Sequence, residues 1–401
     1  MKVELHILQN FAPSNLNRDD TGAPKDCELG GYRRARISSQ CLKRAVRDAF
    51  ETQRMFNGDE LAVRTKRIVE NVAGELARKH NRDRDSAVKL AAETLAGAGL
   101  KVKGVDNDHK SEYLIFLPKR HLAQLAEMID RHWDTLAKLG NASPEPAQGA
   151  DAKAKGKKKE KAEKKGAFPK EIADELIPIF RDATQAPDLA LFGRMIADNP
   201  SWNVDAACQV AHAISTNRVA MDFDFYTAVD DLRPEDTAGS DMMGTVQFNS
   251  SCFYRYSVLD VGDLRRNLGD DNELACKTAG AYIRGSVVAI PTGKQNSMAA
   301  HNPPSFVLAV VRNNGTPVSL ANAFCKPIRP TGESDLVSAS VEALCDYLRR
   351  ICGMYGVAEL DALYIADRDL PDGKQPPVLQ RKADLNQLVA AIESKISGRP
   401  Q

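Results

Sequence analysis

The sequence has no excess of either charge. Lysine and arginine total 55, aspartate and glutamate total 54, and the formal net charge is +1 over 401 residues. This balance excludes a protein that binds polyanions through bulk charge, so any nucleic-acid site must come from segregated charge. No run approaches the roughly 18 apolar residues of a membrane-spanning helix. We therefore expect a cytoplasmic protein without membrane contact.

Signatures of metal sites and disulfides are also missing. The 8 cysteines include no C-x-x-C pair, and the 7 histidines include no H-E-x-x-H pattern. The N-terminal MKVELHILQNF carries Glu4 and His6 inside its apolar run, which predicts a strand and not an export signal. We expect reduced, mostly buried thiols, with no metal and no other cofactor.

One low-complexity segment interrupts the chain. Residues 151–166 read DAKAKGKKKEKAEKKG, with no large apolar side chain. Such a stretch cannot bury enough surface to offset its ordering entropy. We predict a disordered, lysine-rich linker at about 141–168, inside a mostly helical insertion over 57–207.

Alternating and helical patterns predict an α+β fold around this insertion. Lys2–Gln9 alternates with period two, with Val3, Leu5 and Ile7 on one face. Further strands are expected in MDFDFYTA (221–228), GTVQFNS (244–250), SFVLAVV (305–311) and ALYIA (362–366). Helices are expected near 205–215, 272–288, 335–353 and 383–396. The two segments at 221–250 predict a hairpin with a long polar tip.

The strongest functional signal is YRRARISSQCLKRAVR, residues 32–47, which contains no acidic residue. Its cations are Arg33, Arg34, Arg36, Lys43, Arg44 and Arg47. Ser38 is the expected N-cap of a helix, and a helix N-terminus flanked by arginines suits phosphate. The alternative is a solvated basic helix face.

Weaker signals lie further along the chain. Phe223, Phe225 and Tyr226 could stack on bases or face a core. The loop PTGKQNSMAAHNPP, with Lys294 and His301, could contact a ligand or be a plain surface loop. The acidic pairs Asp19-Asp20 and Asp230-Asp231 could serve a metal-dependent nuclease, although adjacent aspartates more often form turns and caps.

Several of these segments occur together in one order: LNRDD (16–20), GGYRRARISSQCLKRAVR (30–47), ALFGRM (190–195), AHAISTN (211–217), DFYTAVDDL (224–232) and GKQNSMAAHNP (293–303). In this order they resemble CasC, the Cascade backbone subunit family of type I-E CRISPR systems, within the Cas-seven superfamily. The likeness spans most of the chain. It is strongest at the N-terminus and around 190–325.

The resemblance implies a hand-shaped fold and a scaffold role without catalysis. An RRM-like (ferredoxin-like) palm would comprise residues 1–56 and 208–401, with helical fingers at 57–207 and a thumb hairpin at about 217–250. Copies would stack head to tail along crRNA. Each thumb would displace one base and leave the rest to pair with a target DNA strand. Other partners would be the large subunit CasA, the small subunit CasB, CasD and the guide-processing CasE.

The resemblance also implies roles for individual residues. Guide-backbone contacts would come from Arg18, Arg34, Arg36, Ser38, Gln40, Lys43, Arg44, Arg47 and Lys294. Met195, Tyr226 and Thr227 would wedge at the displaced base, and Lys25 and Arg33 would face the target strand. Tyr32 is a departure, because family members carry a basic residue there.

Two rival functions follow from the same sequence. The first is a metal-dependent ribonuclease of the same superfamily, using Asp19, Asp20, Asp230 or Asp231. The second is a monomeric RNA-binding module. We expect the non-catalytic scaffold.

Overall fold

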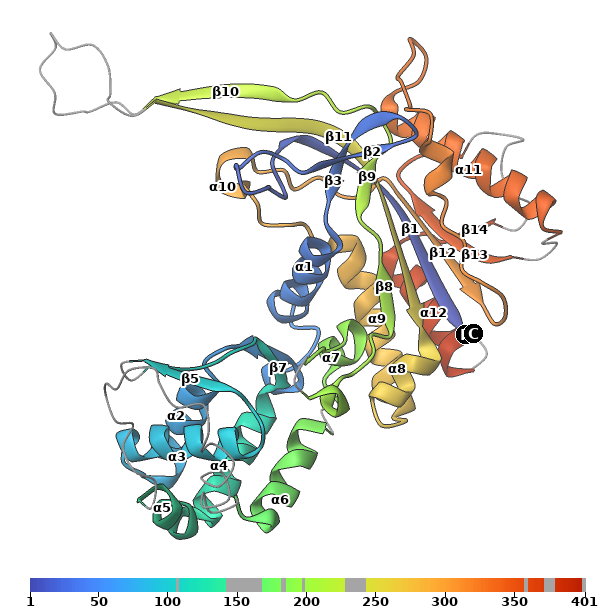
Figure 1. Ribbon diagram of the computed structural model, residues 1–401. Helices are drawn as coiled ribbons and strands as arrows, with labels where there is room; N and C mark the ends of the chain where they lie inside the picture. The colour runs from blue at the N-terminus through green and yellow to red at the C-terminus, as the bar shows by residue number, and fades with distance from the viewer. Residues whose placement is uncertain are drawn as a thin grey trace, which may run out of the picture. The chain divides into compact units, whose positions relative to one another are not determined.

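A computed structural model describes residues 1–105, 108–141, 168–181, 185–196, 199–227, 243–356, 360–370 and 379–398. These residues form two compact units (Figure 1). The first comprises 1–55, 207–266 and 270–401, and the second comprises 56–206 with 267–269. Most of the predicted lysine-rich linker lies outside the described residues.

The first unit is built on a mixed sheet around its N-terminal strand. β1 (Lys2–Ser14) pairs antiparallel with both β11 (Met243–Asp260) and β12 (Phe306–Arg312). The sheet also contains β13 (Asp361–Ala366), β14 (Leu379–Arg381), β8 (Cys208–Val210), β9 (Ala213–Ser215), β3 (Tyr32–Ile37) and β2 (Asp26–Leu29). Since β11 and β12 both oppose β1, they run parallel to each other. With α9 (Asn272–Val288), which lies between them in the chain, they form a split β-α-β unit.

Helices cover both faces of this sheet. On one face lies α9 (Asn272–Val288), which packs against α1 (Ser39–Thr52) and α12 (Leu385–Ser397). Gly285 of α9 lets the Phe50 ring of α1 approach, because a Cβ there would lie 3.1 Å from Phe50 Cε1. On the other face, α11 (Leu336–Met354) places Leu344 in one core cluster with Leu8 and Leu308. The short α8 (Val261–Asn267) follows β11.

Both faces of β1 are therefore buried over residues 3–9, including the polar side chains there. Glu4 and His6 are 0% and 1% exposed beneath α11. Glu4 forms an ion pair with Arg312 and accepts a hydrogen bond from Tyr256 Oη at 3.0 Å. His6 Nδ1 lies 2.8 Å from Tyr254 Oη. Burial, and then the charge of Arg312, lower the pKa of His6 to about 3.

Most predicted elements are confirmed, and one is wrong. Ser38 caps α1, and α9 spans the expected residues. The helix expected over 205–215 is instead the pair of short strands β8 and β9, whose residues Val210 and Ile214 pair with β11. The apolar spacing there fits a helix, but pairing with the long β11 satisfies the backbone of this segment and decides its structure.

The cysteines are all free thiols, and none is exposed. Cys208, Cys252 and Cys345 are buried. Burial raises the pKa of Cys208 and Cys345 to about 12 and that of Cys252 to about 11, so these thiols stay protonated.

The second unit is mostly helical. Its helices are α2 (Ile68–His80), α3 (Arg84–Gly97), α4 (Lys119–Arg131), α5 (Trp133–Asn141), α6 (Lys170–Arg181) and α7 (Pro187–Phe192). Two small antiparallel pairs accompany them: β4 (Ala62–Thr65) with β7 (Ile115–Pro118), and β5 (Val102–Val105) with β6 (Asp108–Ser111). The core is formed by apolar stripes such as Val69, Val72 and Leu76 of α2.

A two-stranded hairpin extends from the sheet of the first unit. β10 (Asp222–Thr227) pairs with the first third of β11, residues 243–248, and the ribbon projects beyond the other strands (Figure 1). Phe223, Phe225 and Tyr226 are exposed, at 65%, 61% and 49%. The expected tip, with Asp230 and Asp231, lies outside the described residues.

Candidate nucleic-acid interface

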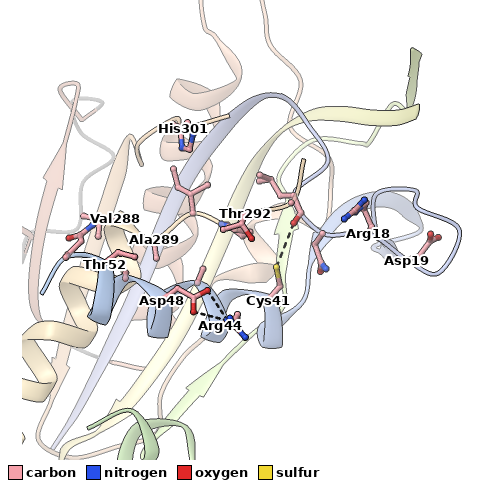
Figure 2. A pocket seen from close by; sticks show the side chains of 18 of the residues that line it. Arg18, Asp19, Cys41, Arg44, Asp48, Thr52, Val288, Ala289, Thr292 and His301 are labelled. Carbon is pink, nitrogen blue, oxygen red and sulfur yellow. Dashed lines mark hydrogen bonds and ion pairs between the residues drawn. The ribbon is translucent and has the colours of Figure 1, made fainter. Parts of the chain in front are cut away.

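A groove of about 730 Å³ lies where three segments of the first unit meet (Figure 2). Its walls are the loop after β1 (residues 16–22), one face of α1, and the segment from Val288 to His301. Its charged or titratable lining residues are Arg18, Asp19, Asp20, Cys41, Arg44, Asp48 and His301. Two predicted guide-binding residues, Arg18 and Arg44, thus share one groove.

The first wall is fixed by amide side chains. Asn15 Nδ2 donates to the carbonyl oxygens of Gly22 at 3.0 Å and Gln247 at 2.9 Å, which ties the loop to β11. Asn17 Oδ1 accepts from the backbone N–H of Ser38 at 2.8 Å. The loop that carries Arg18 is therefore tied to the start of α1.

The opposite wall approaches the first through a glycine. A Cβ on Gly293 would lie 2.3 Å from the carbonyl oxygen of Leu16, so only glycine allows this contact. Lys294 follows in the left-handed conformation, with φ of 53°. Gln295, at the start of α10 (Gln295–Met298), donates to the carbonyl of Pro291 at 3.0 Å. The predicted residue Lys294 thus adjoins the groove without lining it.

The N-cap residue of α1, Ser38, hydrogen-bonds within the helix itself. Ser38 is buried, and its Oγ accepts from the backbone N–H of Cys41 at 3.3 Å. This is an N-cap bond, so the Ser38 hydroxyl stabilises the helix and is 7% exposed. Gln40 in the first turn is exposed.

The cations of α1 divide between two faces. Arg44 and Asp48 line the groove and form an ion pair at 2.8 Å (Figure 2). Lys43 and Arg47, four residues apart on a neighbouring helix face, do not line it. Arg33 forms a second ion pair, with Asp26 at 2.5 Å. Two aspartates that lie outside residues 32–47 in the sequence, Asp26 and Asp48, thus partly neutralise this basic stretch. Such exposed pairs contribute less than about 1 kcal/mol each, so a phosphate can compete for either arginine.

Arg34 requires a correction. It is 0% exposed, and its guanidinium donates to the carbonyl oxygens of Thr216 at 2.7 Å and Phe324 at 2.6 Å, and also to those of Ser215 and Cys325. The predicted contact of Arg34 with guide RNA is wrong for this structure, because the side chain is buried and both of its terminal nitrogens donate to backbone oxygens. Arg34 instead holds three segments together.

Arg36 and Lys25 form a second cationic neighbourhood. Arg36 Nη1 lies 3.1 Å from His212 Nδ1, and its Nε donates to the carbonyl of Asp26 at 3.0 Å. Burial, then Arg36 and then Lys25 lower the pKa of His212. Burial raises the pKa of Cys41, and the charge of Lys25 offsets part of this rise. Both predicted cations are thus near His212, outside the groove's lining.

The ring of Tyr226 lies over the opposite strand of the hairpin. A Cβ on Gly244 would lie 2.4 Å from Tyr226 Cζ, and the two residues are register partners. Phe223 and Phe225 alternate with Tyr226 and so occupy the other face of the ribbon. Thr227 is the last residue of β10.

In the second unit, Met195 is 83% exposed. The turn before it is built by Gly193, with φ of 72°, and by buried Arg194. Arg194 donates to the carbonyl oxygens of Trp202, Phe116 and Phe180. Sequence reasoning missed Arg194. Its only signal was an arginine directly after a glycine in the motif ALFGRM.

The acidic residues show other roles. Asp19 Oδ1 accepts from the backbone N–H groups of Thr21 and Ala23 at 2.9 and 3.0 Å, which makes it a turn former. Hydrogen bonding from Thr21 lowers the pKa of Asp19. Within the part of the chain that the structure describes, no three histidine, cysteine or acidic side chains gather as metal ligands. In that same part, no helix is long and apolar enough to cross a bilayer.

The comparisons with known proteins decide the family. The CT1975-like protein family matches residues 3–391. The chain belongs to this family of Cas proteins, the CasC (Cas7) backbone subunits of type I-E Cascade. The resemblance seen in the sequence is confirmed.

Solved structures agree with this assignment. A chain of a "CRISPR RNA-guided surveillance complex, pre-nicking" is 31% identical with a TM-score of 0.83, covering 99% of this chain and 100% of that one. A chain of a "CRISPR RNA-guided surveillance complex" is 25% identical with a TM-score of 0.72, covering 98% and 100%. No curated protein matches. The α+β fold with a central mixed sheet is thus that of Cascade backbone subunits.

Proposed function

We propose that this Cas7 backbone subunit holds the sugar–phosphate chain of crRNA in the groove between the 16–22 loop, α1 and the 288–301 segment. The observation that carries the proposal is the convergence of Arg18 and Arg44 in one groove along α1. Lys294 adjoins them through the Gly293 contact. Arginines and helix N–H groups together suit phosphate oxygens.

We also propose the three parts of a hand-shaped fold. We assign the palm to residues 1–56 and 208–401, the fingers to 57–207 and the thumb to the hairpin at about 217–250. The split β-α-β unit around β1 supports an RRM-like palm, since ferredoxin-like folds share it. We propose that the exposed Tyr226, with Thr227, and the exposed Met195 each act as wedge residues at a displaced base.

Assembly along the guide follows the same proposal. Head-to-tail contacts that do not close generate an open helical array. Each copy displaces one base and leaves the others to pair with target DNA, while CasA, CasB, CasD and CasE complete a cytoplasmic complex. The subunit acts as a scaffold without catalysis.

Purified protein with its bound nucleic acid tests this function. Contact with about five phosphates per subunit predicts a slope of log Kobs against log salt of about −3 to −4. A slope near zero, or protein that stays free of RNA and solitary when offered a long transcript, contradicts the proposal. Periodic cuts in target RNA with Mg²⁺ would establish the ribonuclease instead, and light scattering separates a monomeric binder from an array.

A further inference from the structure

A second pocket, of about 620 Å³, lies in the first unit beside the C-terminal half of α11. Its walls are one side of that helix and residues 315–320 of the loop after β12. His6 of β1, with Val310 and Arg312 of β12, lines it from the sheet. The pocket shares no lining residue with the groove described above, so it is a separate site.

Much of the pocket is apolar and aromatic. Val310, Leu348 and Leu360 belong to the buried core cluster of the sheet and also line the pocket. Tyr347 and Ile351 are half-buried on the α11 wall. Sites for small organic ligands have volumes of roughly 300–1,000 Å³, apolar walls and a few polar groups that orient the ligand. The size and the walls of this pocket fit that class.

The polar groups come from the buried cluster around Glu4. Glu4 Oε1 accepts from Arg312, and its Oε2 accepts from Tyr256 Oη at 3.0 Å and from the backbone N–H of Val318 at 2.8 Å. Three donors therefore occupy this carboxylate. The formal charges of Glu4 and Arg312 cancel, so the cluster attracts no ion by net charge alone.

Two side chains of the cluster have nitrogens without a partner. Arg312 Nε donates to Glu4, but neither Nη1 nor Nη2 donates to any residue that the structure describes. The Arg312 side chain is 14% exposed and lines the pocket. His6, 1% exposed, lines it too, and its Nε2 has no hydrogen-bond partner in the same described part of the chain. Glu4 Oε2 lies 3.8 Å from that nitrogen, too far for a hydrogen bond.

Tyr254 sets the tautomer of His6. Tyr254 Oη accepts from the backbone N–H of Leu320 at 2.9 Å, and burial raises its pKa, so the hydroxyl keeps its proton. Donation of that proton to His6 Nδ1, 2.8 Å away, leaves the imidazole proton on Nε2. The unpartnered groups of Arg312 and His6 are then all donors, and a ligand must supply the acceptor.

We propose that this pocket binds a small organic molecule with an apolar body and one planar oxygen acceptor, a carbonyl or a carboxylate. The body lies against Tyr347 and Ile351, and the acceptor takes hydrogen bonds from Arg312 and His6. The two terminal nitrogens of a guanidinium match the lone pairs of such a group. The site goes beyond the proposed function and does not depend on it.

The test measures the binding of three naphthalene probes to the full chain by saturation-transfer NMR titration. 1-Naphthaleneacetamide carries a carbonyl, 1-naphthaleneacetate carries a carboxylate, and 1-ethylnaphthalene carries neither. We expect at least one of the acceptor probes to bind about tenfold more tightly than 1-ethylnaphthalene, because a hydrogen bond from a charged donor is gained. The tighter of the two identifies the acceptor.

Two variants separate the polar and apolar contributions. Arg312→Lys keeps a positive charge beside Glu4 but removes the paired nitrogens, so it should abolish the preference for the acceptor probes. Ile351→Phe adds volume to the α11 wall and should weaken the binding of all three probes. The melting temperature of each variant shows that it is folded.

Matched controls make the same changes outside the pocket. Arg381→Lys alters an arginine that pairs with Asp369 in the same unit. Met354→Phe enlarges an exposed side chain of the same helix that does not line the pocket. Both controls should bind the probes as the unaltered protein does.

Cys352 allows a test that needs no substitution. Its half-buried thiol lines the pocket, whereas the half-buried thiol of Cys276 lies outside it. A saturating acceptor probe should slow the alkylation of Cys352 by iodoacetamide severalfold and leave that of Cys276 unchanged, as read by peptide mass mapping. This result would place the probe in the pocket even if a variant fails to fold.

Three outcomes overturn the inference. Neither acceptor probe binds more tightly than 1-ethylnaphthalene, or a probe slows both cysteines equally, and no specific site then exists. The free chain binds the probes but RNA-filled assemblies do not, which would make the pocket a contact between subunits. Failure of the proposed function is distinct, because it appears as unaltered protein without guide RNA, and probe binding is still measured on that protein.

Discussion

The ring of Tyr226 lies directly across Gly244, its register partner on β11. Any larger residue at position 244 would put a Cβ 2.4 Å from Tyr226 Cζ. One side of the ring therefore rests on backbone, while 49% of the residue stays exposed. A glycine beneath an aromatic is a known way to protect a weak point in a strand. Here it also orients an exposed ring.

This relationship predicts the effect of two thumb variants. Tyr226→Ala removes the ring, and Gly244→Val displaces it, so both should blur the periodic pattern of nuclease protection on assembled RNA. The melting temperature should change little, because Tyr226 is 49% exposed and lies on a projecting hairpin. Phe225→Ala is the matched control, since it removes a 61%-exposed ring from the other face of the ribbon. Protection unchanged in both variants would exclude the wedge role.

The groove predicts a loss of electrostatic binding. Arg18→Ala with Arg44→Ala should make the salt slope of RNA binding shallower by about 1.4, because two phosphate contacts to a single strand are lost. Arg54→Ala, an exposed arginine of the same unit outside the groove, should leave the slope unchanged. An equal change in both proteins would show that net charge, and not the groove, sets the slope.

The second face of α1 gives a separate comparison. Lys43→Ala with Arg47→Ala should weaken RNA retention while the helical circular dichroism stays constant, because alanine favours a helix. If helicity falls instead, these residues stabilise the palm. If retention is unchanged while the Arg18 and Arg44 variant loses RNA, the guide follows only the groove face of α1.

Gly293 tests how closely the walls of the groove must approach. Gly293→Ala would place a Cβ 2.3 Å from the carbonyl oxygen of Leu16, which cannot shift cheaply because it is backbone. We expect the two walls to separate and RNA binding to weaken while the palm remains folded. Gly332→Ala, at an open position whose φ is likewise outside the left-handed region, controls for the added methyl group without a contact. Equal effects of the two variants would mean that the approach of the walls is unimportant.

Local patterns predicted the elements but not the roles of buried cations. The Ser38 cap and the bounds of α9 follow from side chains within a few residues, so the sequence contains them. Arg34 lies in the same basic stretch as Arg44, so local sequence does not distinguish the two. Arg34 is buried because it donates to carbonyls far along the chain, including those of Thr216 and Phe324. Long-range pairing also made strands of residues 208–215, where local spacing favours a helix.

Substitutions at the neighbours Arg194 and Met195 should differ widely in their effect on stability. Arg194→Ala leaves three buried carbonyls without their donor, and each lost partner costs about 1–3 kcal/mol, so the variant should lose several kcal/mol of unfolding free energy. Met195→Ala, at 83% exposure, should change stability by less than about 0.5 kcal/mol. Urea unfolding of both variants measures the contrast. A stable Arg194→Ala protein would show that the turn has other support.

The final prediction concerns the pH dependence of stability that the buried His6 of β1 causes. His6 has a pKa lowered from 6.5 to about 3, because burial disfavours the imidazolium and Arg312 repels it. Between these values the unfolded chain binds a proton that the folded chain does not. Stability should therefore fall as the pH drops through this window, by at most about 1.4 kcal/mol per pH unit for one proton.

The variant His6→Gln isolates this effect, because glutamine can still hydrogen-bond Tyr254 Oη and does not titrate. Glu4, whose Oε2 lies 3.8 Å from His6 Nε2, and Arg312 stay in place. Unfolding free energies measured between pH 6.5 and about 5, above the range in which most carboxylates protonate, should fall with decreasing pH in the unaltered protein. The slope should be shallower in the variant. Identical slopes would mean that His6 is protonated in the folded chain, with Glu4 as its counter-ion.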